Sequence, residues 1–200
     1  MNDVGQSRAL SANYYSSMFP IVINSQYLTL GPVVSNQKGY SAGHAGSGSV
    51  TGVDDVYKVV FGPGNTWGKG LPLGKAASRF GGKDKDWSVI TANALEKLGP
   101  IVKEYSPVMN ETVYMWGAVS TITSGKVTGT NMLVTVNGVT LEGMCSGSYS
   151  CKKGDSGAGI FNNDSLSGNN TQACGIQSSA LFKSDDTWAG TSYFTPFPLA

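Results

Sequence analysis

The sequence predicts an all-β protein, either a sandwich or a pair of barrels, and its composition and periodicity carry this prediction. Only 14% of the 200 residues are charged and 27 are glycine, whereas a helical bundle needs many Glu, Lys, Ala and Leu residues. Hydrophobic residues make up 40% of the chain, which excludes a disordered protein and suffices for a sizeable core. β-Branched and aromatic runs separated by turn signals indicate many short strands.

Strand-type sequence occurs in eight runs. They are residues 20–34, 56–61, 86–92, 112–123, 126–141, 157–161, 173–182 and 191–197. Turn signals separate the runs, among them Gly62-Pro63-Gly64-Asn65 and Asn137-Gly138, and the second is typical of a two-residue hairpin loop. Only residues 91–98 have a helical pattern, and we expect about two turns of helix there. The strand signal is weakest between residues 99 and 107, which marks the expected boundary between two halves.

The charge distribution argues against several classes of partner. The net charge is +1, and the sequence has neither a basic stripe nor an acidic tail, so we expect no nucleic-acid partner. No apolar run is long enough to cross a membrane as a helix, so we expect no membrane partner. The first ten residues lack the apolar region of a secretory signal. The low charge content nevertheless favours a secreted protein, and an origin within a viral polyprotein stays open.

The chain has three cysteines, Cys145, Cys151 and Cys174, which allow at most one internal disulfide. A bridge from Cys145 to Cys151 and one from Cys151 to Cys174 are both compatible with the sequence. Three cysteines and one histidine fit no four-ligand zinc site. We therefore expect neither a metal nor an organic cofactor.

The segment Gly154-Asp155-Ser156-Gly157 is the first candidate for catalytic chemistry. Glycines on both sides of a serine permit a sharp turn that exposes the hydroxyl group and leaves neighbouring backbone N–H groups free, as an oxyanion hole requires. The simpler interpretation is a polar surface turn, because a serine nucleophile also needs a histidine base and a carboxylate that orients it. The chain has a single histidine, so the hypothesis stands or falls on that residue.

His44 must therefore be the base if Ser156 is a nucleophile. Several acidic residues are candidates for the orienting carboxylate: Asp54, Asp55, Asp84 and Asp86. Asp86 is preferred because it begins the apolar run Asp86-Trp87-Ser88-Val89-Ile90, which would carry the carboxylate into a buried seam. The other candidates lie in a glycine-flanked polar loop or between two lysines, where we expect a solvated charge.

These motifs resemble those of the chymotrypsin-like serine proteases. Ser41-Ala42-Gly43-His44 is similar to the stretch that carries the catalytic histidine of that family. The run that begins at Asp86 is similar to the strand that carries its aspartate, and residues 154–157 are similar to its nucleophile loop. The order His, Asp, Ser is also that of the family and differs from the orders in subtilisins and α/β-hydrolases. Residues 175–180 and 192–196 resemble the strands that support the aspartate and close the specificity pocket.

The resemblance implies a fold of two six-stranded antiparallel β-barrels with the active site at their seam. One barrel would comprise residues 1–100 and carry His44 and Asp86, and the other would comprise residues 101–200 and carry Ser156. The implied protein is a serine endopeptidase that acts on a polypeptide substrate as a monomer.

The resemblance also implies roles for individual residues. His44, Asp86 and Ser156 would form the catalytic triad, and the reaction would pass through an acyl-enzyme. The backbone N–H groups of Gly154 and Ser156 would form the oxyanion hole, and Ser178 would support Asp86.

The family's specificity pocket maps onto a set of small residues. They are Ser150, Ser178, Ser179, Ala180 and Thr191. None of them is a carboxylate, so a buried Lys or Arg side chain of a substrate would lack a charge partner. We therefore expect no cleavage after Lys or Arg, and the favoured occupant is a medium or large neutral residue. The alternative occupant is an acidic residue, which Lys152 and Lys153 beside the nucleophile loop could attract.

The sequence departs from the animal members of the family. Ala45 replaces the cysteine that usually follows the catalytic histidine. The sequence also lacks an amino terminus of the kind that inserts beside Asp155 in activated zymogens, so Asp155 is expected to pair with Arg8, Arg79 or a lysine. Compact microbial or viral members are nearer.

Two alternatives to a secreted protease stay open. A catalytically inactive homologue would use the same fold as a binding module, although such homologues usually lose one of the three catalytic residues. A viral protease would cleave its own polyprotein, but the viral members that prefer Gln or Glu use a second histidine that this chain lacks.

Overall fold

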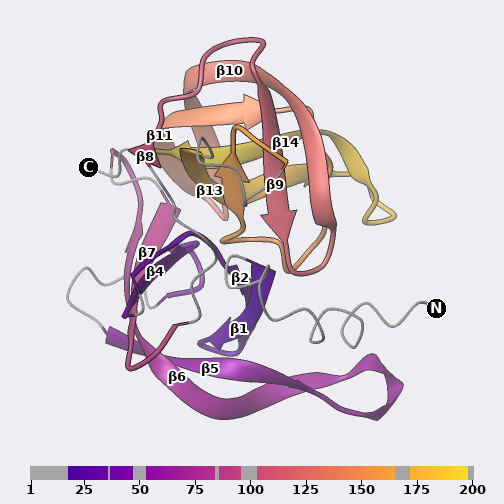
Figure 1. Cartoon of the computed structure of the whole chain (residues 1–200). Coiled ribbons are helices and arrows are strands. Elements are labelled where there is room, and N and C mark those ends of the chain that lie inside the picture. Colours follow the sequence, from indigo (N-terminus) through magenta and orange to yellow (C-terminus); the bar gives the residue numbers. More distant parts are fainter. Residues whose placement is uncertain are drawn as a thin grey trace.

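The computed structural model describes residues 18–35, 37–46, 53–83, 86–95, 103–164 and 172–197. These residues form two β-sheets, one from strands between residues 19 and 92 and the other from strands between residues 103 and 196. The two sheets lie one above the other in Figure 1, and a long hairpin extends from the first.

The first sheet closes into a barrel. Its strands are β1 (Phe19–Ile23), β2 (Gln26–Leu30), β3 (Val33–Ser35), β4 (Lys38–Ser41), β5 (Val53–Phe61), β6 (Trp67–Phe80) and β7 (Asp86–Ala92). Their order across the sheet is β2-β1-β5-β6-β7-β4-β3. Only Gly31 and Pro32 separate β2 from β3, and the N–H of Gly31 donates to the carbonyl of Tyr40 on β4 at 2.7 Å. β2 and β3 therefore act as one bent strand, which gives a barrel of six positions.

The second sheet also closes on itself. Its strands are β8 (Lys103–Glu104), β9 (Thr112–Gly117), β10 (Thr121–Val136), β11 (Val139–Gly147), β12 (Gly159–Phe161), β13 (Gln172–Phe182) and β14 (Trp188–Pro196). The order is β12-β9-β10-β11-β14-β13-β8, and a further pairing of β12 with β13 closes a six-stranded antiparallel barrel. The two-residue β8 is an addition that pairs with β13 in parallel. The predicted fold class is thus confirmed.

The predicted turns are confirmed, whereas the predicted helix is wrong. Asn137 and Gly138 join β10 to β11 with φ angles of +50° and +79°, as a type I′ hairpin turn requires. Of the expected helix at residues 91–98, residues 91 and 92 belong to β7, residues 93–95 form no regular element, and residues 96–98 lie outside the described residues. The reason is pairing on both edges of β7, where Thr91 lies opposite Lys38 of β4 and Lys75 of β6.

The strand β6 was not predicted, although it is one of the longest in the molecule. Its sequence contains three glycines and Pro72 and lacks a clear alternation of apolar and polar residues. Pairing with β5 and β7 on its two edges holds it extended. Pro72 lies opposite Tyr57 at a shift in register, which is where a ladder tolerates a residue without an N–H group.

Four apolar clusters stabilise this arrangement. One fills each barrel, and a third lies at the seam, where Tyr40 of the first barrel packs with Trp116, Phe161 and Ile176 of the second. The fourth packs β10 against β11. The rings of Tyr40 and Phe197 meet edge to face with centroids 5.7 Å apart. The seam is therefore a packed interface that fixes the two barrels relative to each other.

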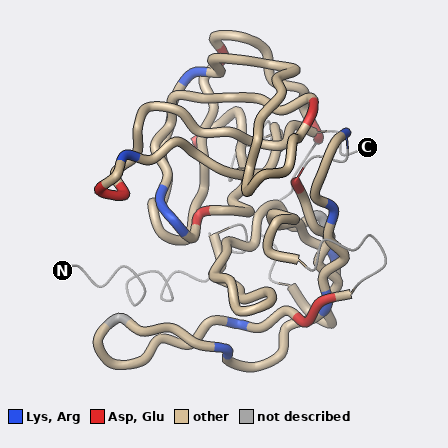
Figure 2. The backbone as a smooth tube through the Cα atoms, turned by 180° about the vertical axis from the view of Figure 1, so that it is seen from behind, with Lys and Arg blue, Asp and Glu red and all other residues tan. Residues whose placement is uncertain are grey.

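The surface carries little charge, and the charges are mixed. Along the backbone trace, Lys, Arg, Asp and Glu positions are scattered over both barrels, and most positions carry none of them (Figure 2). Within the described part of the chain, no helix has the length and apolar character needed to cross a membrane.

Candidate active site

His44 and Asp86 lie together at the seam, as predicted from the sequence. His44 follows the end of β4, and Asp86 is the first residue of β7. The Nδ1 atom of His44 lies 2.7 Å from Oδ2 of Asp86, while the backbone N–H groups of Gly43 and His44 donate to Oδ1 at 2.6 and 2.7 Å. Gly43 is required here, because a Cβ atom at this position would stand 2.0 Å from the carbonyl oxygen of Arg79.

The second barrel holds Asp86 from the opposite side. The hydroxyl of Ser178 on β13 donates to Oδ2 of Asp86 at 2.5 Å. Thr195 on β14 contacts the backbone of the same residue, since its hydroxyl donates to the Asp86 carbonyl at 2.9 Å. Asp86 is fully buried, and each carboxylate oxygen accepts two of these hydrogen bonds. The predicted supporting role of Ser178 agrees with this contact, whereas the sequence did not point to Thr195 as a partner of Asp86.

The environment favours the charged forms of both groups. Burial opposes the charged form of His44, but the negative charge of Asp86 and the hydrogen bond to it outweigh burial and raise the pKa of His44 above its ordinary value. Burial likewise opposes ionisation of Asp86, yet the charge of His44 and hydrogen bonds from His44 and Ser178 lower the pKa of Asp86. The pair is thus electrostatically suited to stabilise an imidazolium ion.

Ser156 lies in a loop between the two barrels. Its carbonyl accepts the N–H of Thr29 on β2 at 2.8 Å, and the N–H of the next residue, Gly157, donates to the carbonyl of Gln177 on β13 at 2.8 Å. The loop is therefore fixed by β2 on one side and β13 on the other. Ser156 and His44 line the same pocket, while the Ser156 hydroxyl donates to the Ser178 carbonyl at 3.2 Å rather than to the imidazole of His44.

Some backbone N–H groups of the loop donate hydrogen bonds within the protein and others do not. Those of Asp155 and Gly157 donate to the carbonyls of Lys152 and Gln177. The N–H groups of Gly154 and Ser156 donate to no other residue in the part of the chain that the structure describes. Gly154 has a φ of +99°, a value that L-residues rarely adopt. The loop thus has two N–H groups, on either side of Asp155, that are not engaged by the described residues.

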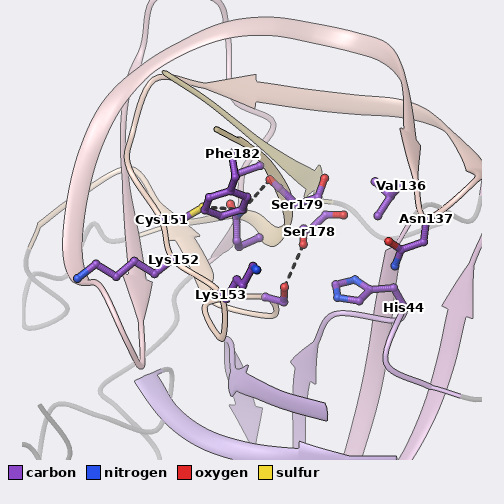
Figure 3. Close-up of a pocket in the computed structure, with 12 residues that line it drawn as sticks. His44, Val136, Asn137, Cys151, Lys152, Lys153, Ser178, Ser179 and Phe182 are labelled. Atoms are coloured by element: carbon purple, nitrogen blue, oxygen red, sulfur yellow. Dashed lines mark hydrogen bonds between the residues drawn. The ribbon is translucent and has the colours of Figure 1, made fainter. Parts of the chain in front are cut away.

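A pocket of about 160 Å³ lies beside Ser156. Its walls include three of the residues predicted to bind substrate, Ser178, Ser179 and Ala180. The other two, Ser150 and Thr191, are not among its lining residues, and Ser150 is exposed. In Figure 3 the imidazole of His44 and the ring of Phe182 lie at opposite ends of the pocket.

The pocket has lysines at its rim and no acidic residue among its lining residues. Lys152 extends away from the pocket in Figure 3. Lys153 forms an exposed ion pair with Asp186 at 2.8 Å. Such a pair contributes little to stability, so Lys153 can exchange this partner for another anion at small cost.

The cysteines are not bridged. All three are free thiols buried in or beside the interior of the second barrel, so neither of the two disulfides considered from the sequence is present. Burial is the main cause that raises the pKa of Cys151 to about 12, although a hydrogen bond from Ser192 opposes the shift. The Cys151 thiol therefore stays protonated near neutral pH, which makes it a poor nucleophile.

Comparison with known proteins identifies the architecture. No protein-family model and no protein of curated function matches the sequence, but solved structures do match. The chain superposes on a Cellulomonas bogoriensis chymotrypsin with a TM-score of 0.65 and 20% identity over 91% of this chain and 92% of the other. The chain has the chymotrypsin-like fold. A structural likeness at 20% sequence identity establishes the fold alone, because one fold can host many activities.

Other bacterial proteases of the chymotrypsin-like fold give similar matches. A Nocardiopsis protease matches with a TM-score of 0.66 and 18% identity over 90% of this chain and 91% of the other. Thermobifida fusca protease A matches with a TM-score of 0.65 and 18% identity over 90% of each chain. The expected likeness to compact microbial members is thereby confirmed for the fold.

Within this chymotrypsin-like fold, Asp155 is held differently from the expectation. Its fully buried carboxylate accepts the backbone N–H groups of Val119, Ser120 and Lys152 at 2.9, 3.0 and 2.8 Å. The expected pairing is wrong for Arg79 and for the lysines that the structure describes, because three N–H groups already satisfy the carboxylate; Arg8, Lys85 and Lys97 lie outside the described residues. The turn between β9 and β10 thus takes the place of a cationic partner.

Gln177 is a further residue of the pocket that was not predicted from the sequence. It lines the pocket and is 1% exposed, with Nε2 donating to the Ser179 carbonyl at 2.8 Å and to Sγ of Cys151 at 3.5 Å. The hydroxyl of the fully buried Tyr149 donates to Oε1 of Gln177 at 2.6 Å. The available signal was a glutamine directly after the run Ala173-Cys174-Gly175-Ile176 of a strand, because a buried amide group needs a hydrogen-bond partner.

Proposed function

We propose that this protein is a serine endopeptidase that hydrolyses polypeptides through an acyl-enzyme. The observation that carries the proposal is the contact of the two barrels at Asp86. Its carboxylate joins the imidazole of His44 to Ser178, beside a loop that presents the hydroxyl of Ser156 and two free N–H groups. A structural turn alone would not need a fully buried carboxylate on the only histidine of the chain.

In the first half of the proposed reaction, Oγ of Ser156 attacks the carbonyl carbon of a peptide bond. Rotation about the Cα–Cβ bond of Ser156 releases the hydrogen bond to Ser178 and directs the hydroxyl to His44, which accepts the proton at Nε2. The Asp86 carboxylate stabilises the imidazolium ion. The oxyanion of the tetrahedral intermediate accepts hydrogen bonds from the N–H groups of Gly154 and Ser156.

The second half returns the enzyme to its starting state. His44 donates its proton to the leaving amine, and the carbon–nitrogen bond breaks to leave the acyl group on Ser156. Water then attacks the ester and gives its proton to His44, and the imidazolium returns it to Oγ of Ser156 as the acid product leaves. The residues named here can perform every step without a metal or an organic cofactor.

The pocket supports one statement on specificity. With no carboxylate among its lining residues, a Lys or Arg side chain of the substrate would be buried without a charge partner, which is costly. We therefore propose that cleavage after Lys and Arg is disfavoured. A neutral medium or large residue stays the favoured occupant, and Lys153 provides for an acidic one.

The test of the proposed function is active-site labelling combined with hydrolysis. The wild-type protein should be labelled at Ser156 by a fluorophosphonate and should hydrolyse a casein substrate. Ser156→Ala should abolish labelling and lower hydrolysis by about 10⁴-fold or more, because it removes the nucleophile, without changing the thermal unfolding midpoint. Absence of labelling in the folded wild-type protein would instead indicate a binding module on the same fold.

A further inference from the structure

An exposed aromatic pair lies at the end of the long hairpin formed by β5 and β6. This hairpin extends beyond the body of the first barrel (Figure 1). Phe61 and Trp67 lie opposite each other at the last strand pair before the turn, and they are 53% and 43% exposed. Large aromatic side chains of this kind are usually covered in a monomer, so a pair left open indicates a contact surface.

Tyr27 connects this pair to the candidate active site. Its ring centroid lies 6.4 Å from that of Phe61 and 5.5 Å from that of Trp67. The same ring packs against the nucleophile loop, since a Cβ atom at Gly154 would stand only 2.7 Å from Cδ1 of Tyr27. Tyr27, Phe61 and Trp67, here called the aromatic cluster, therefore form a continuous apolar surface that reaches the loop bearing a candidate oxyanion donor.

The position of the aromatic cluster assigns it to one side of the scissile bond. The pocket for the acyl residue is lined by β13 through Ser178, Ser179 and Ala180. Tyr27 belongs to β2, which holds the nucleophile loop from the side opposite β13. A peptide that places its acyl residue in the pocket must therefore continue, after the scissile bond, across β2 towards the aromatic cluster.

We propose that the aromatic cluster binds an apolar side chain of the substrate on the leaving-amine side of the scissile bond; this rests on the proposed function. The acidic residues of the hairpin, Asp54 and Asp55, lie opposite Ala76 and Lys75 at the end away from Phe61 and Trp67. The residues from Val56 to Phe80 include no Asp or Glu, so the part of the hairpin that carries the aromatic pair offers a basic leaving segment no ionic partner. Aromatic faces gain from contact with aliphatic or aromatic side chains. The chemistry that fits this surface is a Leu or Phe residue within the first two positions after the bond.

Acyl transfer tests this subsite independently of the acyl specificity. N-acetyl-alanine p-nitrophenyl ester would acylate Ser156 and release nitrophenol, and the small alanine makes no demand on the pocket. The acyl-enzyme is then divided between water and an added amine, Leu-Leu-amide or Gly-Gly-amide. The amine attacks the ester carbonyl, its proton passes through His44 to Oγ of Ser156, and an amide bond forms as the ester bond breaks. By microscopic reversibility the amine occupies the leaving-amine site.

The expected result is a preference for Leu-Leu-amide that depends on the aromatic cluster. Wild-type protein should use it several-fold better than Gly-Gly-amide, and Trp67→Ala should lower this ratio by about fivefold to tenfold, as for loss of an apolar contact in a specificity site. Phe61→Ala should act in the same direction. The matched control is Leu71→Ala, which removes a side chain 74% exposed on the same hairpin but outside the aromatic cluster.

Nitrophenol release separates the possible failures. Measured without added amine, it should be the same in the wild-type protein, the hairpin variants and the control, because steady-state turnover of such an activated ester is limited by hydrolysis of the acyl-enzyme, which has no group left on the leaving-amine side. An unchanged ratio in Trp67→Ala with normal nitrophenol release would overturn the subsite and leave the proposed function intact. An equal loss with both amines would also overturn it, in favour of a structural or self-association role. Wild-type release no faster than that of Ser156→Ala would refute the proposed function itself.

Discussion

Asp86 organises the candidate site at the scale of single residues. Its two carboxylate oxygens together accept hydrogen bonds from the imidazole of His44, from two backbone N–H groups and from Ser178. In a buried position each of these bonds has a large effect, because an unpaired carboxylate there is costly. The choice of Asp86 among the four candidate acidic residues was predictable from the sequence, since it alone begins an apolar strand. The contact with Thr195 depends on a residue 109 positions away, which local sequence does not reveal.

The raised pKa of His44 predicts the position of the acid limb of activity. A general base must be neutral, so activity should rise with pH through the pKa of His44. Since Asp86 raises that pKa above its ordinary value of 6.5, the midpoint of the limb in kcat/KM should lie above pH 6.5. In Asp86→Asn the opposing effect of burial stays, so the midpoint should shift to lower pH, and kcat should fall by about 10⁴-fold.

A kcat/KM profile against pH on a peptide substrate measures both effects. Asp55→Asn is the matched control, because Asp55 is exposed and its partner in the described part of the chain is Lys75; its profile should match that of the wild-type protein. A limb with the same midpoint in wild type and Asp86→Asn would show that the titrating group does not contact Asp86.

At the scale of elements, the turn between β9 and β10 supports the nucleophile loop. The N–H groups of Val119 and Ser120 bind the buried carboxylate of Asp155. Asp155 lies between the two residues whose N–H groups are free, so its orientation determines where those groups point. The elements themselves hold this arrangement, and it does not require a cationic partner for the carboxylate.

Gly117 is the point at which this support is most easily broken. A Cβ atom at Gly117 would stand 2.2 Å from Oδ1 of Asp155, so Gly117→Ala should displace the carboxylate and with it the oxyanion donors. We expect kcat/KM to fall by about tenfold or more and the free energy of unfolding to fall by about 1–3 kcal/mol. Gly68→Ala is the control, because the nearest atom to its Cβ would be 3.9 Å away. Full activity in folded Gly117→Ala would contradict the proposed support.

Elements were predictable from sequence where a strand carries its own signal. The run at residues 86–92 coincides with β7, and Asn137-Gly138 has the positive φ angles of a type I′ hairpin turn. The strand β6 has no such signal, because its glycines and Pro72 are held extended by pairing with β5 and β7. Gln177 was missed for a similar reason, since its role depends on the hydroxyl of Tyr149, a residue 28 positions away that reaches it only in the folded barrel.

At the scale of the whole molecule, the candidate site exists only where the two barrels meet. Thr29 of the first barrel donates through its N–H to the Ser156 carbonyl and through its hydroxyl to the Gly154 carbonyl. In return, Ser178 and Thr195 of the second barrel hold Asp86 of the first. Folding of the seam and assembly of the site are therefore one process, and stability and activity should respond to the same ionisation.

The His44–Asp86 pair predicts opposite responses of stability and activity to pH. Because the folded protein raises the pKa of His44, it binds this proton more tightly than the unfolded chain does. The resulting stability is fully present below the unfolded pKa of about 6.5 and is lost as pH rises through the folded pKa. For Asp86 the folded pKa is lowered, so its contribution is present above the unfolded pKa and is lost as pH falls through the folded value.

The free energy of unfolding should therefore decrease with rising pH over the interval in which activity increases. Denaturant unfolding at closely spaced pH values measures this, and the chain has no other histidine to obscure it. His44→Gln removes the ionisable group, so in this variant the decrease above pH 6.5 should disappear. A free energy that rises with pH in the wild-type protein, or falls equally in His44→Gln, would show that the proton on His44 does not stabilise the seam.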